Sequence, residues 1–312
     1  MKSANCSILL ALGLVVQGTA GPLSERFFVV AQSGPLSKIF VVRRDGRDWR
    51  RLTNLTGSEA DAAYCASRHE VYYRKLVDSD WELAAWDLDH QENRIIHRCK
   101  GLDRQPTPSP DGSQLAFTSD RFGNDELMLL ALDTPEAEAV RLTWDQGEDC
   151  SPSWSPDGRR LTFASRRNGQ SDIYCIDVTS GQQQRITRTD DEDEVDPRWS
   201  PDGVRILFQT VEGRYRRGEL GLIDVASQTV TRIPEIGGSA HQASWSPDGS
   251  SLIYLDYRSA RQPSSPALTT YSLADRATQP VTLYRRELEL THWSFRQASW
   301  TTTSLRVREK HE

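Results

Sequence analysis

The tetrapeptide Ser-Pro-Asp-Gly occurs four times in this 312-residue chain at nearly constant spacing. The copies begin at Ser109, Ser155, Ser200 and Ser246, so successive copies are 46, 45 and 46 residues apart. A fixed period of this length is typical of a chain built from copies of one supersecondary unit. The repeat therefore constrains the fold more than any single residue does.

Each copy of the repeat predicts a tight turn followed by short β-strands. Pro presets the second position of a turn, Asp favours the next position, and Gly tolerates the positive φ after it. In the copy at 153–187, residues 161–165 show the period-two pattern of a strand, and 173–178 are a second β-rich run. A final short strand is expected at 184–187. One period thus holds four antiparallel strands, and no helical periodicity appears after residue 21.

Four strands in a period of about 40 to 50 residues describe one blade of a β-propeller. The complete periods are 64–107, 108–153, 154–198, 199–244 and 245–299. Residues 298–307 contain only the start of a repeat, and residues 26–53 contain only the rest of one. We expect these segments to pair in a sixth blade that closes the ring and removes its free sheet edges. The predicted fold is an all-β, six-bladed propeller over residues 21–312.

Residues 1–20 have the pattern of a secretory signal peptide. Lys2 precedes the apolar run Ile8–Val16, and Ala20 is a small residue suited to cleavage. The run is too short to span a bilayer, and the alternative interpretation is a short buried strand. We therefore expect a periplasmic or secreted protein without an integral membrane segment.

Charge and cysteine content narrow the possible partners. The chain has 44 acidic and 38 basic residues, a net charge of −6, which disfavours nucleic acid as a partner.

An exported chain could pair Cys65, Cys99, Cys150 and Cys175 as disulfides. Their irregular spacing predicts neither a connectivity nor a metal site, and Cys175 falls within a predicted strand as a small buried side chain. No cofactor is indicated.

The repeat resembles the TolB-type propeller repeat. The shared features are Trp-Ser-Pro-Asp-Gly, Leu-x-Phe, a Ser-Arg loop with Gly, Asp-Ile-Tyr and a closing Arg-Ile-Thr. They are clearest at 153–187 and recur at 107–143, 197–232 and 243–257, so the resemblance covers roughly residues 25–307. In TolB, such repeats form the domain that contacts a peptidoglycan-associated lipoprotein in the bacterial periplasm. Related repeats also cover the active sites of some proteases and occur in some lyases.

The chain departs from TolB in one respect. In TolB, a small α/β domain precedes the propeller. Here only a predicted leader and a partial blade precede residue 64. We expect a stand-alone propeller without the TolB N-terminal α/β domain. No Gly-x-Ser-x-Gly elbow of a hydrolase occurs, and the Asp of each Ser-Pro-Asp-Gly copy is expected to stabilise its turn.

The face opposite these turns carries the longer and more irregular loops, where a fixed scaffold commonly binds its partners. They include 187–197, 211–218, 256–266 and 285–297. One position at the start of each innermost strand is polar in all six copies. These residues are Asp61, Gln105, Ser151, Asp196, Gln242 and Gln297. We predict that they form a polar ring that binds a partner at the mouth of the central channel; the alternative is ordinary solvation of a strand end.

Further candidates lie in the same loops. The acidic run 190–194, with Asp196 beyond it, could attract a basic partner, bind Ca²⁺ or simply be solvated. A basic set could contact a protein or be loop decoration; it comprises Arg214, Tyr215, Arg216, Arg217, Arg258 and Arg261. His241 and His292 join the candidate binding residues, but without a clear third ligand they do not predict a metal site.

Two functional classes remain. The first is an exported, monomeric, non-enzymatic propeller that binds a protein or peptide partner through its loop-rich face and channel mouth. The second is a lyase or hydrolase acting on a polysaccharide or small molecule, for which His241, His292 and Asp196 are the candidate residues. We favour binding because the sequence contains no recognisable catalytic constellation. A purely structural surface protein is a third, lesser possibility.

Overall fold

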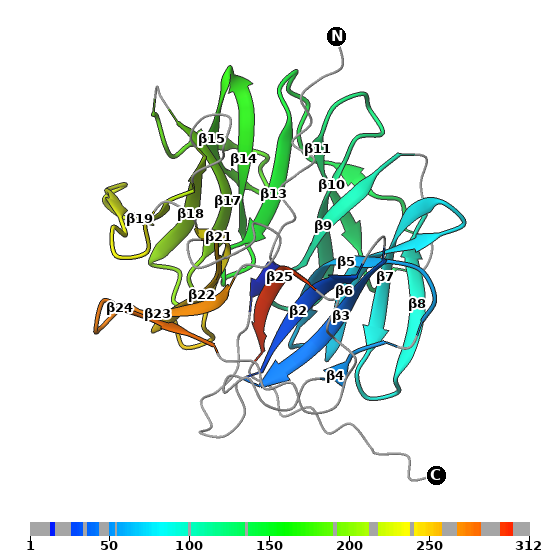
Figure 1. The fold of residues 1–312 in the computed structure, drawn as a ribbon. Helices are drawn as coiled ribbons and strands as arrows, with labels where there is room; N and C mark the ends of the chain where they lie inside the picture. The colour runs from blue at the N-terminus through cyan, green and yellow to red at the C-terminus, as the bar shows by residue number, and fades with distance from the viewer. Residues whose placement is uncertain are drawn as a thin grey trace.

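The structure is a computed structural model of the chain. It describes residues 13–15, 26–33, 36–43, 50–53, 55–98, 101–134, 137–189, 192–211, 218–237, 240–257, 267–281 and 294–301. All regular elements in these ranges are β-strands, as Figure 1 shows. Over the same ranges, no helix long and apolar enough to cross a membrane is found. The chain is an all-β propeller of four-stranded antiparallel blades.

Five blades are each formed from one contiguous stretch of chain, with the strands in sequence order. The first comprises β5 (Glu59–Cys65), β6 (Glu70–Val77), β7 (Asp80–Asp87) and β8 (Glu92–His97). The second comprises β9 (Asp103–Pro108), β10 (Gln114–Ser119), β11 (Glu126–Ala131) and β12 (Val140–Arg141). The third comprises β13 (Asp149–Trp154), β14 (Arg160–Asn168), β15 (Gln170–Asp177) and β16 (Gln183–Arg185).

The remaining two contiguous blades follow the same order. One comprises β17 (Asp193–Trp199), β18 (Arg205–Val211), β19 (Leu220–Asp224) and β20 (Val230–Arg232). The other comprises β21 (Ala240–Trp245), β22 (Ser251–Asp256), β23 (Ala267–Ser272) and β24 (Ala277–Pro280). The predicted period boundaries were one strand late, because Trp154, Trp199 and Trp245 end the innermost strands instead of beginning a blade.

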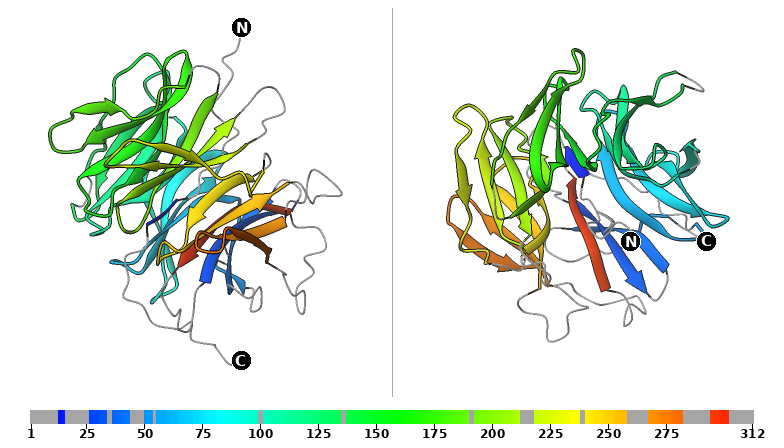
Figure 2. Two further views of the ribbon diagram at one scale, coloured as in Figure 1. Left: turned by 90° about the vertical axis from the view of Figure 1, so that its left-hand side faces the viewer. Right: turned by 90° about the horizontal axis from the view of Figure 1, so that it is seen from above.

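A further four-stranded sheet joins segments from opposite ends of the sequence. Strand β25 (Ser294–Thr301) pairs antiparallel with β2 (Arg26–Ser33), and β3 (Leu36–Arg43) and β4 (Arg50–Arg51) follow in that order. In this register Phe27 lies opposite Trp300. Strand β25 contacts β21 and β22 on one side and β5 on the other. Figure 2 shows β25, in red, beside the blue strands of this sheet.

Strand β1 (Gly13–Val15) lies within the predicted leader. It pairs parallel with β5, with Gly13 opposite Ala63 and Val15 opposite Cys65. It also contacts β9, β13, β21 and β25, which are the innermost strands of other sheets. In the full chain, this segment therefore lies among the strands that surround the centre of the propeller.

The Ser-Pro-Asp-Gly turns stabilise themselves. Ser109 Oγ donates to Asp111 Oδ1 at 2.6 Å and accepts from the backbone N–H of Gln114 at 2.9 Å. Gly112 has a φ of 76°, which favours glycine, and its N–H donates to Ser109 O at 2.9 Å. The other three copies repeat the Gly-to-Ser bond at 2.9 Å. The Asp residues of these turns thus have the structural role that the sequence predicted.

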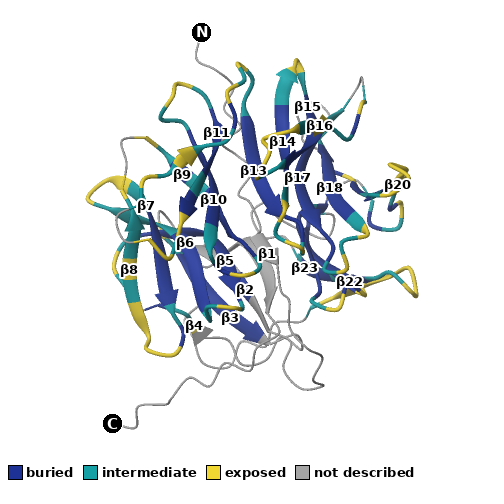
Figure 3. Cartoon of the chain, turned by 180° about the vertical axis from the view of Figure 1, so that it is seen from behind, coloured by how far each residue is buried: buried dark blue, intermediate teal, exposed yellow. Residues whose placement is uncertain are grey.

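The apolar core lies between neighbouring blades, and Figure 3 shows the inner strands buried and the outer loops exposed. One cluster joins Ala116 and Leu127 of one blade to Trp154 and Phe163 of the next. Trp154 Nε1 also donates to the backbone oxygen of Thr107 at 3.0 Å, across the same junction. Trp245 Nε1 bonds Arg198 O in the same way at 3.0 Å. Trp154 and Trp245 therefore pack one blade against the next.

Candidate functional site

Four of the predicted channel-mouth residues form a hydrogen-bonded belt across successive blades. The backbone N–H of Gln105 donates to Asp61 Oδ2 at 3.1 Å, and Gln105 Nε2 donates to Ser151 Oγ at 3.0 Å. The backbone N–H of Ser151 donates to Gln105 Oε1 at 2.9 Å, and its hydroxyl donates to Asp196 Oδ1 at 2.9 Å. The belt, comprising Asp61, Gln105, Ser151 and Asp196, joins the innermost strands β5, β9, β13 and β17.

Each belt residue has an unusual backbone conformation. Their φ values lie between 51° and 57°, and Gln242, at the matching position of β21, has a φ of 54°. All five lie at a shift in register between the innermost strand and its neighbour, which is a β-bulge. Such a conformation is costly for a residue other than glycine. Its recurrence in five blades indicates that the bulge is what directs these side chains toward the adjacent blade.

The belt residues are almost fully buried. Asp61, Gln105, Ser151 and Asp196 are each no more than 5% exposed. Asp61 Oδ2 also pairs with Arg74 Nε at 2.9 Å, and Thr118 Oγ1 donates to Gln105 Oε1 at 2.9 Å. These contacts join the belt side chains to neighbouring strands and stabilise the blade junctions. The partner-binding role assigned to these residues remains a prediction.

Of the other predicted site residues, His241 and Gln242 are described with their side chains. His241 Nδ1 lies 2.8 Å from Gln209 Nε2, and its ring meets Tyr257 edge-on at 5.1 Å between centroids. The backbone N–H of Gln242 donates to Gln209 Oε1 at 3.3 Å, so Gln209 serves both neighbours. Gln297 belongs to β25, opposite Val30, and only its backbone is described. His292 lies outside the described residues.

A second set of polar residues at the same end of the blades was missed by sequence reasoning. Arg121 Nη2 binds both carboxylate oxygens of Asp103, at 3.1 and 3.0 Å. Arg167, the equivalent residue one repeat later, binds Asp149 at 2.8 Å and Asp145 at 2.8 Å. Each Arg follows the Ser of the Ser-x-Arg loop, so the recurrence of that tripeptide was the available signal. In these two blades, the pairs join the region around the end of the second strand to the start of the innermost strand.

Buried carboxylates recur at these junctions. Burial raises the pKa of Glu126, which accepts hydrogen bonds from Thr143 Oγ1 at 2.5 Å and Arg141 Nη2 at 2.6 Å. Burial also raises the pKa of Asp149 and of Glu194. A raised carboxyl pKa means that folding favours the protonated form of these groups. Their perturbation follows from structural burial in a repeat, which does not by itself indicate catalysis.

Two described residues of the acidic run form ion pairs with arginines. Glu192 pairs with Arg232, and Asp193 Oδ2 lies 3.0 Å from Arg166 Nη2. Within the described ranges, no group of three or more His, Cys, Asp or Glu side chains is placed to hold a metal ion. Asp190 and Asp191 lie outside those ranges, and so do all six residues of the basic set.

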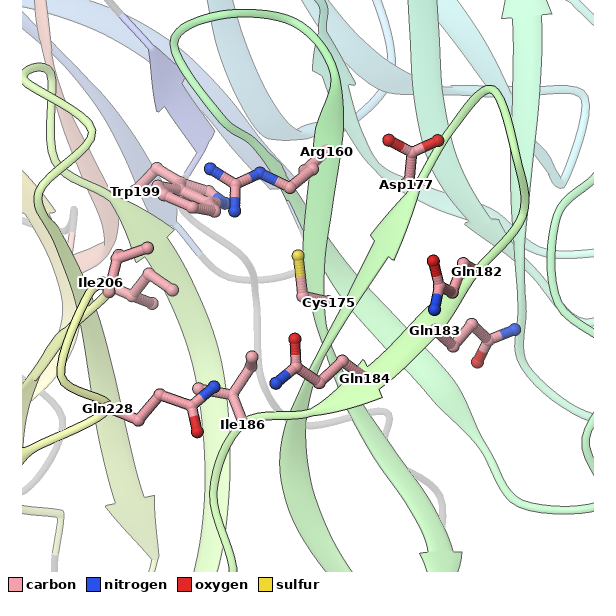
Figure 4. Close-up of a pocket in the computed structure, with 11 residues that line it drawn as sticks. Arg160, Cys175, Asp177, Gln182, Gln183, Gln184, Ile186, Trp199, Ile206 and Gln228 are labelled. Atoms are coloured by element: carbon pink, nitrogen blue, oxygen red, sulfur yellow. The ribbon is translucent and has the colours of Figure 1, made fainter.

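A pocket of about 330 Å³ lies between the blades β13–β16 and β17–β20, and no belt residue lines it (Figure 4). The Arg160 guanidinium in its wall lies 4.8 Å from the ring centroid of Trp199. At the next junction Arg205 lies 5.2 Å from Trp245 in the same way, so this contact belongs to blade packing. Burial raises the pKa of the Cys175 thiol to about 11, which keeps it protonated and unreactive at neutral pH.

Three of the cysteines named in the sequence can be placed. Cys65, Cys150 and Cys175 are buried thiols, and none of them forms a disulfide within the part of the chain that is described. Cys99 lies outside it. The three thiols thus behave as small apolar side chains in the blade junctions, as was expected for Cys175.

Solved structures share this fold. The chain is similar to TolB from Acinetobacter baumannii, with 21% identity and a TM-score of 0.73 over 90% of this chain and 67% of that one. It is similar to a putative TolB from Agrobacterium tumefaciens, with 16% identity and a TM-score of 0.64 over 90% of this chain and 100% of that one. Oligogalacturonate lyase has 13% identity and a TM-score of 0.54 over 81% of this chain and 73% of that one. At these identities the likeness concerns the fold alone.

Sequence comparison points to the same family. A protein named TolB homolog, from Chlorobium luteolum, is 34% identical over 68 residues, which are 22% of this chain and 16% of that protein. The match thus spans a small part of that relative's length. The family model described as the TolB beta propeller domain matches residues 66–297, which is most of the chain. The chain belongs to the family of TolB β-propeller domains.

Proposed function

We propose that this protein is an exported, non-enzymatic propeller that binds a protein or peptide partner through its loop-rich face and channel mouth. The observation that carries the proposal is the contrast between the two ends of the blades. One end carries four near-identical turns whose Ser and Asp side chains bond each other. The other end carries loops that differ from blade to blade around the belt. Variation on a constant scaffold is typical of a recognition surface.

We propose further that the shared sheet closes a ring of six blades. Support comes from the contacts of β25 with β21 and β5, which are the innermost strands of the blades on either side of it. Closure would leave no open blade face and would give the channel a complete wall. The polar residues at the starts of the innermost strands would then encircle the channel mouth.

We also propose a periplasmic or secreted location. The support is the leader pattern of residues 1–20 and the membership of the TolB propeller family. In this account, the leader is removed and residues 21–312 form a monomeric propeller. Mass spectrometry of the protein isolated from its host would test cleavage directly, since an N-terminus that retains Met1 would refute it.

The binding proposal is tested by photo-crosslinking in the native host, followed by mass spectrometry of the adducts. A photoreactive residue at the exposed position Gln146 should yield one discrete adduct, and Asp196→Asn or Gln242→Ala should abolish it. The matched control is Asp177→Ala, which removes a turn carboxylate at the opposite end of a blade. Thermal melting checks that every variant is folded. Turnover of a glycan or ester substrate, or an adduct unchanged in both site variants, would contradict the proposal.

A further inference from the structure

Three large apolar side chains are exposed in a single blade. Phe122 is 49% exposed, Val140 is 62% exposed and Trp144 is 67% exposed. Phe122 lies in the loop between β10 and β11, and Trp144 lies in the link from β12 to β13. Both connections lie at the end of the blade where the belt begins. The loop-rich face therefore presents two aromatic rings close to the proposed binding region.

Arg141, which pairs with the buried Glu126, lies near both rings. The Arg141 guanidinium lies 4.4 Å from the ring centroid of Phe122 and 5.9 Å from that of Trp144. Arg141 Nη2 donates to Glu126 Oε1 at 2.6 Å, and Nε donates to Thr143 O at 2.6 Å. Glu126 is fully buried and positions the Arg141 guanidinium through this hydrogen bond. Phe122, Arg141 and Trp144 form the aromatic cluster, in which two hydrogen bonds position the cation. A positioned cation reduces the entropic cost of binding.

The repeat itself does not require these aromatic residues. The residue equivalent to Phe122 in the next blade is Asn168. The residues that follow the same Arg-x-x unit in other blades are Asn54, Arg188 and Glu235, where this blade has Trp144. The fold therefore accepts a polar residue at both positions. Exposed aromatic surface that packing does not need commonly marks an interaction site.

The polar groups around the cluster identify the kind of partner. Asn124 Nδ2 donates to Asp145 O at 2.9 Å and to Gly147 O at 3.0 Å, and Asp145 pairs with Arg167 at 2.8 Å. A sugar would need polar groups beside the rings that are available to its hydroxyls, whereas these groups bond each other. Exposed Trp and Phe beside Arg are instead typical of the central residues of a protein interface.

Charge adds a second constraint. The link from Trp144 to Asp149 carries three carboxylates and no Lys or Arg, and two of the carboxylates pair with Arg167 of β14. We propose that the aromatic cluster binds an apolar or aromatic side chain of a protein partner, from a segment that carries Lys or Arg beside it. This inference rests on the proposed function, because it names the chemistry of the partner at the loop-rich face.

The test uses a peptide library displayed on phage and selected against the full chain. Selected peptides are synthesised, and their affinities are measured by fluorescence polarisation. Trp144→Ala and Phe122→Ala should each weaken binding by about tenfold or more, the usual effect of removing a central interface residue. Val204→Ala is the matched control, since Val204 is 50% exposed but follows a Ser-Pro-Asp-Gly turn at the other end of its blade. It should leave affinity within about twofold.

The outcomes separate this inference from the proposed function. Selected peptides that bind the Trp144→Ala protein as tightly as the unchanged one would overturn the inference. So would binding to an immobilised glycan that Trp144→Ala abolishes. If Gln242→Ala removes peptide binding and Trp144→Ala does not, the proposed function stands and the aromatic cluster has no part in it. If only the cluster variants remove binding, the inference stands and the channel-mouth part of the proposed function fails.

Discussion

Ser151 shows how one small side chain can join three blades. It accepts from Gln105 Nε2 and donates to Asp196 Oδ1, while its own N–H donates to Gln105 Oε1. Ser151→Ala would leave two buried polar groups without this partner, at a cost of about 2 kcal/mol in the free energy of unfolding. Urea denaturation measures the loss. Ser180→Ala, in an exposed turn, should cost less than about 0.5 kcal/mol, and equal losses would contradict a special role for the belt.

Neighbouring arginines near the end of β14 provide a second test at the residue scale. Arg167 binds the fully buried Asp149 and lies 4.4 Å from the ring centroid of Tyr174, whereas Arg166 pairs with the partly exposed Asp193. Arg167→Met should cost about 3 to 5 kcal/mol, because it leaves an uncompensated buried carboxylate. Arg166→Met should cost at most about 1 kcal/mol. Similar urea midpoints for the two variants would refute the distinction.

At this scale the sequence located residues better than it assigned their roles. The recurring spacing placed Asp61, Gln105, Ser151 and Asp196 at one structural position. It could not show that a left-handed backbone turns each side chain toward the next blade, because that depends on register between strands. The aromatic cluster was missed for a related reason. Phe122 and Trp144 are 22 positions apart, and only the pairing of β11 with β12 brings Arg141 between them.

At the scale of the element, the turn repeats predict a particular response to acid. The hydroxyl of Ser109 and the backbone N–H of Ser113 hold the pKa of Asp111 below its usual value. Because the folded pKa is lower than the unfolded one, the unfolded chain binds more protons in acid. The stabilisation by Asp111 is therefore present above the unfolded pKa and is lost as pH falls through the folded pKa.

The measurement compares the unchanged protein with Asp111→Asn by urea denaturation from about pH 6 to about pH 3. The difference in the free energy of unfolding should shrink as the pH falls, since Asn has no charge to lose. A difference that stays constant over this range would contradict the assignment. Asp80→Asn provides the control, as Asp80 is an exposed carboxylate at the start of β7.

The elements themselves were largely predictable. Turn chemistry and period-two alternation identified the strands of each blade, because both are local properties of the sequence. The blade boundaries were misplaced by one strand, since Trp154 marks the end of β13 and the sequence does not say which sheet a strand joins. That choice is made by the hydrogen bonds from β13 to β14, which form only when the turn at Ser155 closes the hairpin.

For the whole molecule, the shared sheet predicts that stability depends on both ends of the chain. A protein ending at residue 293 would lack β25 and would expose the edge of β2, which pairs with it over Arg26–Gln32. We expect this variant to unfold at a lower temperature and to aggregate, because an open edge invites pairing with other chains. A protein ending at Thr301 retains β25 and is the control. Equal melting temperatures for the two would refute ring closure.

The strand β1 has a consequence for when the protein becomes competent to bind. As long as residues 13–15 remain attached, they occupy the inner edge of β5 that an incoming extended peptide would otherwise find vacant. Cleavage of the leader would free that edge at the moment of export. Under the proposed cleavage, the mature propeller would therefore present a strand edge that the precursor covers.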